Sequence, residues 1–204
     1  MTTTAAPPST RERILATTAE LFRRQGYTGT GLKQIVAAAN APFGSLYHHF
    51  PGGKEQLGAE VIRSSGKMYE ELVMTILRGS SDIVTGVRDA FPAAAVVLDE
   101  TDYADACPIE TVALEVSSTN EPLREACAEV FESWITAGTS VHAEGGLPEA
   151  KARELAILFI STLEGAFVLC RALRNTEALE VAAELVSSVV EGALLQTKAA
   201  RRKR

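Results

Sequence analysis

Hydrophobic positions recur at helical spacing along most of this 204-residue chain. The first amphipathic stretch opens at Ser9 and Glu12, which have the spacing of a capping box, and it closes at Gly26. Its apolar face includes Ile14 and Phe22. No segment shows the strict alternation of a β-strand, and no Asn-Gly or Asp-Gly hairpin signal is present. The pattern therefore predicts an all-α fold.

Residues 30–54 predict two short helices joined by a tight turn. Asn40 tolerates the left-handed backbone that ends a helix, and Pro42 has the fixed φ that suits the start of the next one. The second helix, from Phe43 to about Phe50, spans about two turns and is too short to be stable alone in water. A short helix that is held by a preceding one and shows polar and aromatic side chains is typical of a helix-turn-helix recognition element.

The remainder of the chain is predicted to be helical as well. A long helix is expected from Lys54 to Arg78. Further helices are expected at Ile83–Leu98 with a kink or break at Pro92, at Ile109–Ser117, from Glu121 past Trp134, at Glu149–Arg174 and at Glu177–Lys198. The last helix carries an apolar stripe broad enough for a four-helix dimer interface. The residues predicted at this interface are Leu179, Val186, Val189, Val190, Ala193 and Leu194.

Charge is divided unevenly along the chain, whose formal net charge is −6. Residues 1–79 carry nine Lys/Arg and six Asp/Glu, whereas residues 80–197 carry six and twenty, and residues 198–204 add five basic residues. A basic head on an acidic body is typical of a DNA-binding module attached to a sensor. We therefore expect a disordered N-terminus at 1–8, a DNA-binding head at 9–53, a linking, ligand-binding and dimerising body at 54–198 and a basic tail at 199–204.

The motif in the head resembles that of the TetR family of bacterial repressors. Ala38-Ala39-Asn40 stands at the turn, Gly44-Ser45-Leu46-Tyr47-His48-His49-Phe50 follows it, and Lys54 comes shortly after. The turn Asn, the Pro42-Phe43 pair and the additional glycine at 52–53 depart from the usual pattern. That glycine, with Cys107-Pro108 and Glu115, resembles the LmrA/YxaF-like branch. The resemblance implies a homodimeric repressor with a three-helix head and a helical body, which controls an efflux or modifying gene near its own.

The resemblance and the polarity of the second short helix together assign the DNA contacts. Tyr47, His48 and Lys54 are expected to contact phosphates. Ser45 and Gln34 can donate to phosphates or to base edges. Gly44 allows close approach of the DNA, while Phe43 either meets a thymine methyl or packs back on the protein. The complete predicted set is Thr30, Lys33, Gln34, Pro42, Phe43, Gly44, Ser45, Tyr47, His48 and Lys54.

An effector cavity is expected in the helical body. Glu115 and Glu164 lie in apolar sequence surroundings, where an isolated carboxylate is costly. Each either pairs with an arginine, such as Arg171 or Arg174, or orients a polar or cationic group of a ligand. Aromatic side chains can line such a cavity, although each alone is more often part of a core. The predicted cavity residues are Phe91, Glu115, Phe131, Trp134, Phe159, Thr162, Glu164 and Phe167.

The sequence gives little support to other locations and chemistries. No apolar run approaches the ~20 residues that span a bilayer, and the N-terminus lacks a signal peptide, which predicts a cytoplasmic protein with no membrane partner. The three cysteines have no metal-ligand or redox spacing, so reduced thiols are expected, with a redox sensor as the alternative. Because His48 and His49 are adjacent on a helix, they diverge and cannot chelate one metal together. No metal or cofactor is expected.

These observations predict a ligand-responsive, DNA-binding repressor that a small, largely apolar effector releases from a pseudo-palindromic operator. An enzyme is not expected, because the sequence has no nucleophile with an adjacent base, no phosphate loop and no metal-ligand spacing. One alternative is a dimeric small-molecule-binding module with a degenerate head, suggested by Pro42-Phe43. A less favoured alternative is an enzyme that acts on a hydrophobic small molecule.

Overall fold

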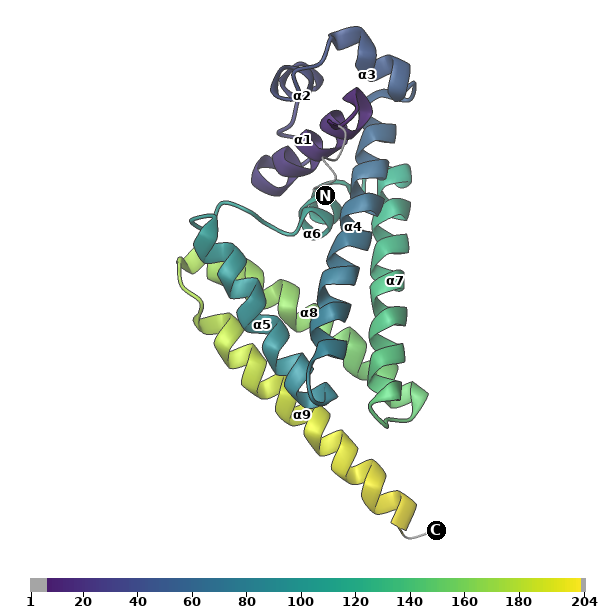
Figure 1. The fold of residues 1–204 in the computed structure, drawn as a ribbon, viewed down its shortest axis with the longest axis vertical. Helices are drawn as coiled ribbons and strands as arrows, with labels where there is room; N and C mark the ends of the chain where they lie inside the picture. Colours follow the sequence, from purple (N-terminus) through teal and green to yellow (C-terminus); the bar gives the residue numbers. More distant parts are fainter. Residues whose placement is uncertain (1–6, 203–204) are drawn as a thin grey trace, which may run out of the picture. The chain divides into compact units, whose positions relative to one another are not determined.

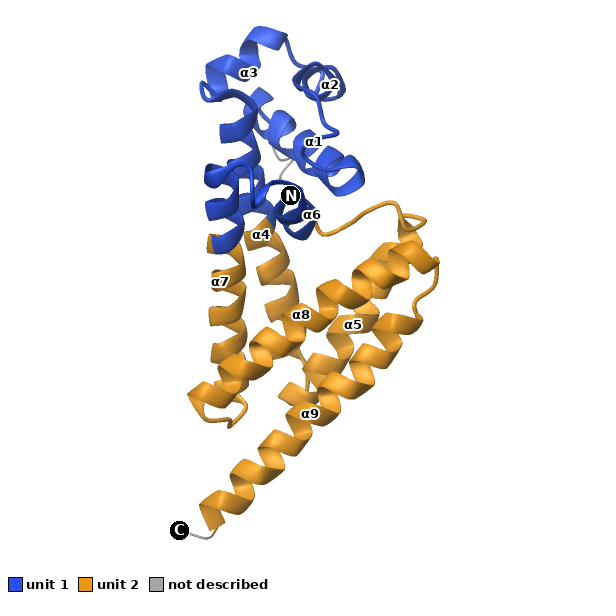
Figure 2. Cartoon of the chain, turned by 180° about the vertical axis from the view of Figure 1, so that it is seen from behind, with its two compact units in different colours: residues 1–65, 108–128 blue, residues 66–107, 129–204 orange. Residues whose placement is uncertain are grey.

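The computed structural model describes residues 7–202, and these residues form nine helices and no strand (Figure 1). The predicted all-α fold is therefore confirmed for the described residues. Most of the predicted disordered N-terminus (residues 1–6) and the end of the basic tail (203–204) lie outside them. The chain divides into two compact units, which are coloured separately in Figure 2. Unit 1 contains residues 1–65 and 108–128, and unit 2 contains residues 66–107 and 129–204.

Unit 1 is built on a three-helix arrangement near the N-terminus. Its helices are α1 (Thr10–Gln25), α2 (Leu32–Ala38), α3 (Phe43–His49), the first part of α4 (Gly53–Gly79), α6 (Pro108–Val116) and the first part of α7 (Glu121–Glu144). Both α2 and α3 pack against α1, and α6 packs against α1 as well. Fully buried side chains such as Ile14, Phe22 and Leu46 close the core. This unit is larger than the predicted head at 9–53, because it includes α6 and the start of α4.

Local signals explain where the first helices begin and end. Ser9 caps α1 through the predicted capping box, in which its side chain and that of Glu12 each accept a hydrogen bond from the other residue's backbone N–H. Asn40 adopts the expected left-handed conformation, with φ of 47°. Pro42 is the N-cap of α3 and Phe43 its first residue. The turn is tied to α1 by Arg13, which donates to the carbonyl oxygens of Ala39 at 3.2 Å and Asn40 at 3.3 Å.

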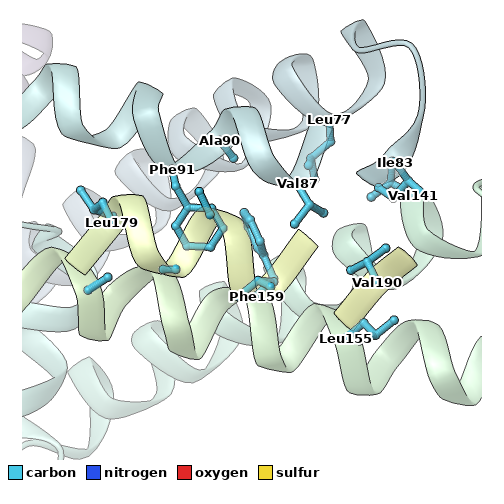
Figure 3. Close-up of a cluster of buried hydrophobic side chains, with 14 of the residues drawn as sticks. Leu77, Ile83, Val87, Ala90, Phe91, Val141, Leu155, Phe159, Leu179 and Val190 are labelled. Atoms are coloured by element: carbon cyan, nitrogen blue, oxygen red, sulfur yellow. The ribbon is translucent and has the colours of Figure 1, made fainter. Parts of the chain in front are cut away.

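Unit 2 is organised around a hydrophobic core between three long helices. These are α5 (Ile83–Glu100), α8 (Glu149–Leu173) and α9 (Glu177–Arg202), which all contact one another. Figure 3 shows Phe91 of α5 beside Phe159 of α8, and their ring centroids lie 5.4 Å apart in an edge-to-face contact. No break occurs at Pro92, because α5 continues through it. The prolonged α9 also includes Arg201 and Arg202, which were predicted in a separate tail.

Helix α8 leaves much of its apolar surface uncovered by this chain. By length and composition it is the one described helix that is long and apolar enough to cross a membrane, which the sequence analysis did not anticipate. Core helices of soluble proteins pass the same test, but only 28% of its most apolar window is buried here. Leu169 and Leu173 are 53% and 62% exposed. The core of its own unit therefore explains only part of the apolar character of α8.

Candidate DNA-binding surface and effector cavity

The outward side of α3 presents two aromatic rings to solvent. Phe43 and Tyr47 are 45% and 48% exposed, although large aromatic side chains normally contribute to a core. Their rings meet edge to face with centroids 5.9 Å apart. On the opposite side of the helix Leu46 is fully buried in the core of unit 1. The short helix is thus anchored by one face and offers the other to a partner, and Phe43 does not pack back into the core.

Most of the predicted DNA-binding residues lie on the surface of unit 1. A side chain added at Gly44 would meet no atom within 4 Å, so a ligand can approach the backbone there closely. Ser45 is half-buried. The exposed members of the predicted set are Lys33, Gln34, Pro42, Phe43, Gly44, Tyr47 and His48. The surface therefore combines a cation, an amide, a hydroxyl, two aromatic rings and an imidazole, which are groups that contact phosphates and base edges.

Thr30 does not belong to this surface, which corrects the sequence prediction. Its side chain is 1% exposed and donates to the carbonyl oxygen of Gly26 at 2.6 Å. The hydroxyl therefore closes the α1–α2 turn and is not available to DNA. Gly31 is the N-cap of α2 and supplies no side-chain hydrogen bond. The sequence could not show this because a threonine before a helix is equally suited to capping it.

Lys54 is held by its own unit more closely than its sequence position suggests. Its Nζ lies 4.1 Å from the ring centroid of Tyr27, which is a cation–π contact. Burial lowers the pKa of Lys54, and the negative charge of Glu115 acts in the opposite direction. The ammonium is half-buried at the start of α4. For the predicted phosphate contact, the Lys54 side chain therefore has to leave the Tyr27 ring.

Glu115 lies in unit 1 and does not line a cavity, which corrects its predicted role as a buried ligand anchor. It is exposed on α6, and its Oε2 accepts a hydrogen bond from the backbone N–H of Thr28 at 2.8 Å. A Cβ added to Gly26 would lie 1.8 Å from Glu115 Oε1, so the carboxylate sits directly on the α1–α2 loop. Its apolar neighbours Val112 and Val116 are buried, whereas Leu114 is exposed as Glu115 is. Nothing in the local pattern identifies this long-range contact.

Unit 2 contains a cavity of about 140 Å³ with mainly apolar walls. The walls come from α4, α5, α7, α8 and the segment 105–107. Four predicted residues line it, namely Trp134, Phe159, Glu164 and Phe167. Phe91 is buried in the core beside Phe159, and Phe131 contacts the Trp134 ring, but neither reaches the cavity; nor does Thr162. The sequence reasoning missed the α4 and α5 walls, because small and aliphatic residues such as Val73 and Ala94 are indistinguishable from ordinary core residues in a sequence.

Trp134 is held in place at the edge of this cavity. Its Nε1–H donates to the carbonyl oxygen of Gly66 at 2.9 Å, and its ring meets that of Phe131 with centroids 5.6 Å apart. A Cβ at Gly66 would lie 2.4 Å from Val130 Cγ1, so only glycine permits this approach of α4 and α7. The indole is therefore a fixed part of the wall and its position reports on this region.

The predicted dimer stripe on α9 is wrong for half of its members. Leu179, Val186 and Val190 are 0%, 3% and 0% exposed within this chain, since they pack in the core of unit 2. Figure 3 labels Leu179 and Val190 in this core. Ala193 and Leu194 are partly buried against the same core, and Val189 is exposed. The amphipathic pattern identified the face of α9 that is buried. It did not show whether this face packs against the same chain or against a second one. The exposed apolar residues on the other side of the helix are Val181, Leu185 and Val189.

Two protein families match separate parts of the sequence. Residues 14–61 match the N-terminal domain of bacterial regulatory proteins of the tetR family, and residues 84–185 match the C-terminal domain of LmrA/YxaF-like transcriptional regulators. An uncharacterized HTH-type transcriptional regulator of Bacillus subtilis, YxaF, is 37% identical over 180 residues, which are 88% of this chain and 94% of the relative. The regulator LmrA of the same organism is 33% identical and covers 83% and 90%.

Solved structures share the fold. A TetR transcriptional regulator from Chloroflexus aurantiacus has a TM-score of 0.74 at 31% identity, covering 89% of this chain and 94% of that one. A cysteine variant of the regulator CifR, solved with a 26-base-pair operator DNA, has a TM-score of 0.75 at 20% identity and covers 90% and 98%. The families and relatives are transcriptional regulators and not enzymes.

Proposed function

The chain belongs to the TetR family of DNA-binding transcriptional regulators, in its LmrA/YxaF-like branch, and we propose that it is a homodimeric repressor released from its operator by a small, largely apolar effector. The observation that carries this proposal is the pairing of an exposed aromatic and polar face on α3 with an apolar cavity in the other unit. A regulator that senses a compound needs both surfaces in one chain.

The DNA-binding part of the proposal rests on α3 and α2. Tyr47, His48 and Lys33 supply contacts to phosphates, which fix the position of the head on the duplex. Gln34 and Ser45 read base edges, and the exposed Phe43 meets a thymine methyl. Because two heads related by a twofold axis read two half-sites, the operator is pseudo-palindromic.

The dimer is proposed to form through the outer faces of α8 and α9. Val181, Leu185 and Val189 are 50%, 63% and 49% exposed at a spacing of four residues, so they form one stripe on α9. Added side chains at Gly165 of α8 and Gly192 of α9 would meet no atom within 4 Å, so both helices can approach a second chain closely. Covering these faces with the same faces of a second copy removes a large apolar surface from water.

Release of DNA follows if the effector binds better to a conformation in which the two heads no longer match the operator. The effector can shift this equilibrium only by its difference in affinity for the two conformations. Coupling of this kind is reciprocal, so operator DNA weakens effector binding by the same factor. Because Trp134 lines the cavity, its emission is expected to change when a compound occupies the cavity.

The experiment that tests this proposal titrates the protein against the DNA upstream of its own gene, with and without a panel of lipophilic compounds. We expect sequence-specific binding that falls steeply with salt, because phosphate contacts release counterions. A compound that releases the DNA is expected to change Trp134 emission over the same concentrations. If the compounds change the emission and no DNA binds, the protein is a dimeric binding module with a degenerate head. If no compound affects either signal, effector control is refuted.

A further inference from the structure

The charged groups that line the cavity of unit 2 all have the same sign. Among the described residues that form its walls, Glu70 of α4, Asp105 of the segment before α6 and Glu164 of α8 are acidic, and none is a lysine, arginine or histidine. Three different elements contribute these acidic residues to the lining. The rest of the lining is almost entirely aliphatic and aromatic. The walls therefore attract an apolar group and, by their charge, a cation.

From this lining we infer that the effector is a hydrophobic cation, with an aromatic or aliphatic body and an amine or quaternary ammonium group. The inference rests on the proposed function, since it names the chemical class of the effector for the same cavity. It excludes hydrophobic anions such as fatty acids and sulfonates, for which three carboxylates in apolar walls are repulsive.

The surroundings strengthen the effect of these charges. Asp105 is 7% exposed, and Glu164 is half-buried. Because apolar walls screen charge less well than water does, a cation inside the cavity is attracted more strongly than it would be at the protein surface. Hydrogen bonds to the carboxylates do not remove their charge. Glu70 accepts such a bond, since its Oε2 lies 2.5 Å from the Ser133 hydroxyl that donates to it.

Aromatic residues add a second attraction for the same class of ligand. Tyr69, Trp134, Phe159 and Phe167 line the cavity together with the carboxylates. The face of an aromatic ring is electronegative and attracts ammonium groups, and quaternary ammonium ligands are recognised in proteins by such rings. An inorganic cation gains nothing from these walls, because it would have to lose its water shell against apolar side chains. The combination selects organic cations.

The test uses three probes of closely similar size, namely phenyltrimethylammonium, its uncharged isostere tert-butylbenzene and the anion benzenesulfonate. Binding to the full-length protein is followed by Trp134 emission and by calorimetry. We expect phenyltrimethylammonium to bind at least about tenfold more tightly than benzenesulfonate, since the lining attracts one and repels the other. Replacing both Asp105→Asn and Glu164→Gln is expected to remove most of that preference and to leave the affinity for tert-butylbenzene within about twofold.

Two controls make the outcome specific to the cavity. Glu149→Gln also removes one carboxylate from α8, but at its exposed first turn, and is expected to leave all three affinities unchanged. Glu70→Gln provides an independent single variant in case the double variant unfolds. If tert-butylbenzene binds and releases DNA while the cation binds no better than the anion, the inference is overturned and the proposed function stands. If none of the three probes binds the protein, the inference is overturned, while operator binding and the wider compound panel still decide the proposed function.

Discussion

The two units of this protein differ in how much apolar surface they leave uncovered by their own residues. In unit 1 the loops are closed by specific hydrogen bonds, from Arg13 to the turn, from Thr30 to Gly26 and from Thr28 to Glu115. Unit 2 instead leaves apolar area open, inside as a cavity and outside on α8 and α9. This difference fits the proposed roles, since side chains that contact DNA need fixed positions, whereas binding of an effector and of a second chain needs available apolar surface.

The largest expected effect separates the inner from the outer face of α9. Val190→Asp places a charge in the core of unit 2, where Val190 is 0% exposed, and is expected to destabilise the chain by several kcal/mol, about 3 or more. Leu185→Asp changes a side chain that is 63% exposed, so the fold is expected to survive while the dimer dissociates. Circular dichroism during thermal unfolding and analytical ultracentrifugation measure the two outcomes. A monomeric, folded Val190→Asp variant would contradict the assignment of faces.

A smaller effect is expected on the surface of α3. Tyr47→Ala is expected to weaken binding to all DNA sequences about tenfold, because a phosphate contact carries no sequence information. Ser45→Ala is expected to change the preferred sequence instead. Leu114→Ala on α6 serves as the control, since Leu114 is 78% exposed in the same unit and away from the proposed surface. Binding isotherms on operator and unrelated DNA distinguish a phosphate contact from a base contact. If Tyr47→Ala alters sequence preference, the phosphate role assigned to Tyr47 is wrong.

The contact between α6 and the head gives a third test. Glu115→Gln removes the charge that accepts from the Thr28 N–H and faces Lys54, and is expected to lower the stability of unit 1 by about 1 kcal/mol. DNA affinity should fall with it, while binding of tert-butylbenzene in unit 2 should not change. Glu125→Gln removes an exposed carboxylate from α7 in the same unit and provides the matched control. Equal effects of the two variants would show that the Thr28 contact contributes nothing specific.

The smallest effect is expected from a change in pH, and it concerns the stability of unit 2. His142 is fully buried, and burial lowers its pKa below the ordinary value of 6.5, with a partly opposing effect from its contact to the Gly138 carbonyl oxygen. The unfolded chain therefore takes up a proton at a higher pH than the folded one. Stability from this group is present above about pH 6.5 and is lost as the pH falls below it. Chemical denaturation between pH 7 and 5.5 should show this decrease, and a His142→Gln variant should show less of it.

The sequence predicted features that depend on neighbouring residues and failed for those that depend on distant ones. The capping box at Ser9, the left-handed Asn40 and the motif on α3 were all correct, because each is set within a few residues. The faces of α9 were partly wrong, since an apolar stripe looks the same whether it meets α5 or a second chain. Glu115 was misplaced because its partner is 87 residues away. The cavity walls on α4 and α5 consist mainly of ordinary aliphatic residues, which carry no local signal in a sequence.

The close approach at Gly66 constrains how this sequence can change over evolutionary time. Any larger residue at this position would overlap Val130, whose Cγ1 lies 2.4 Å from the place of a Cβ. A substitution at 66 is therefore accessible only after position 130 has become smaller, and the two positions are expected to vary together among descendants of this chain. The order of events matters as well, because a smaller residue at 130 leaves a gap in the packing, whereas a larger residue at 66 overlaps Val130 as long as position 130 is unchanged. Substitution at position 130 is therefore expected to come before substitution at position 66.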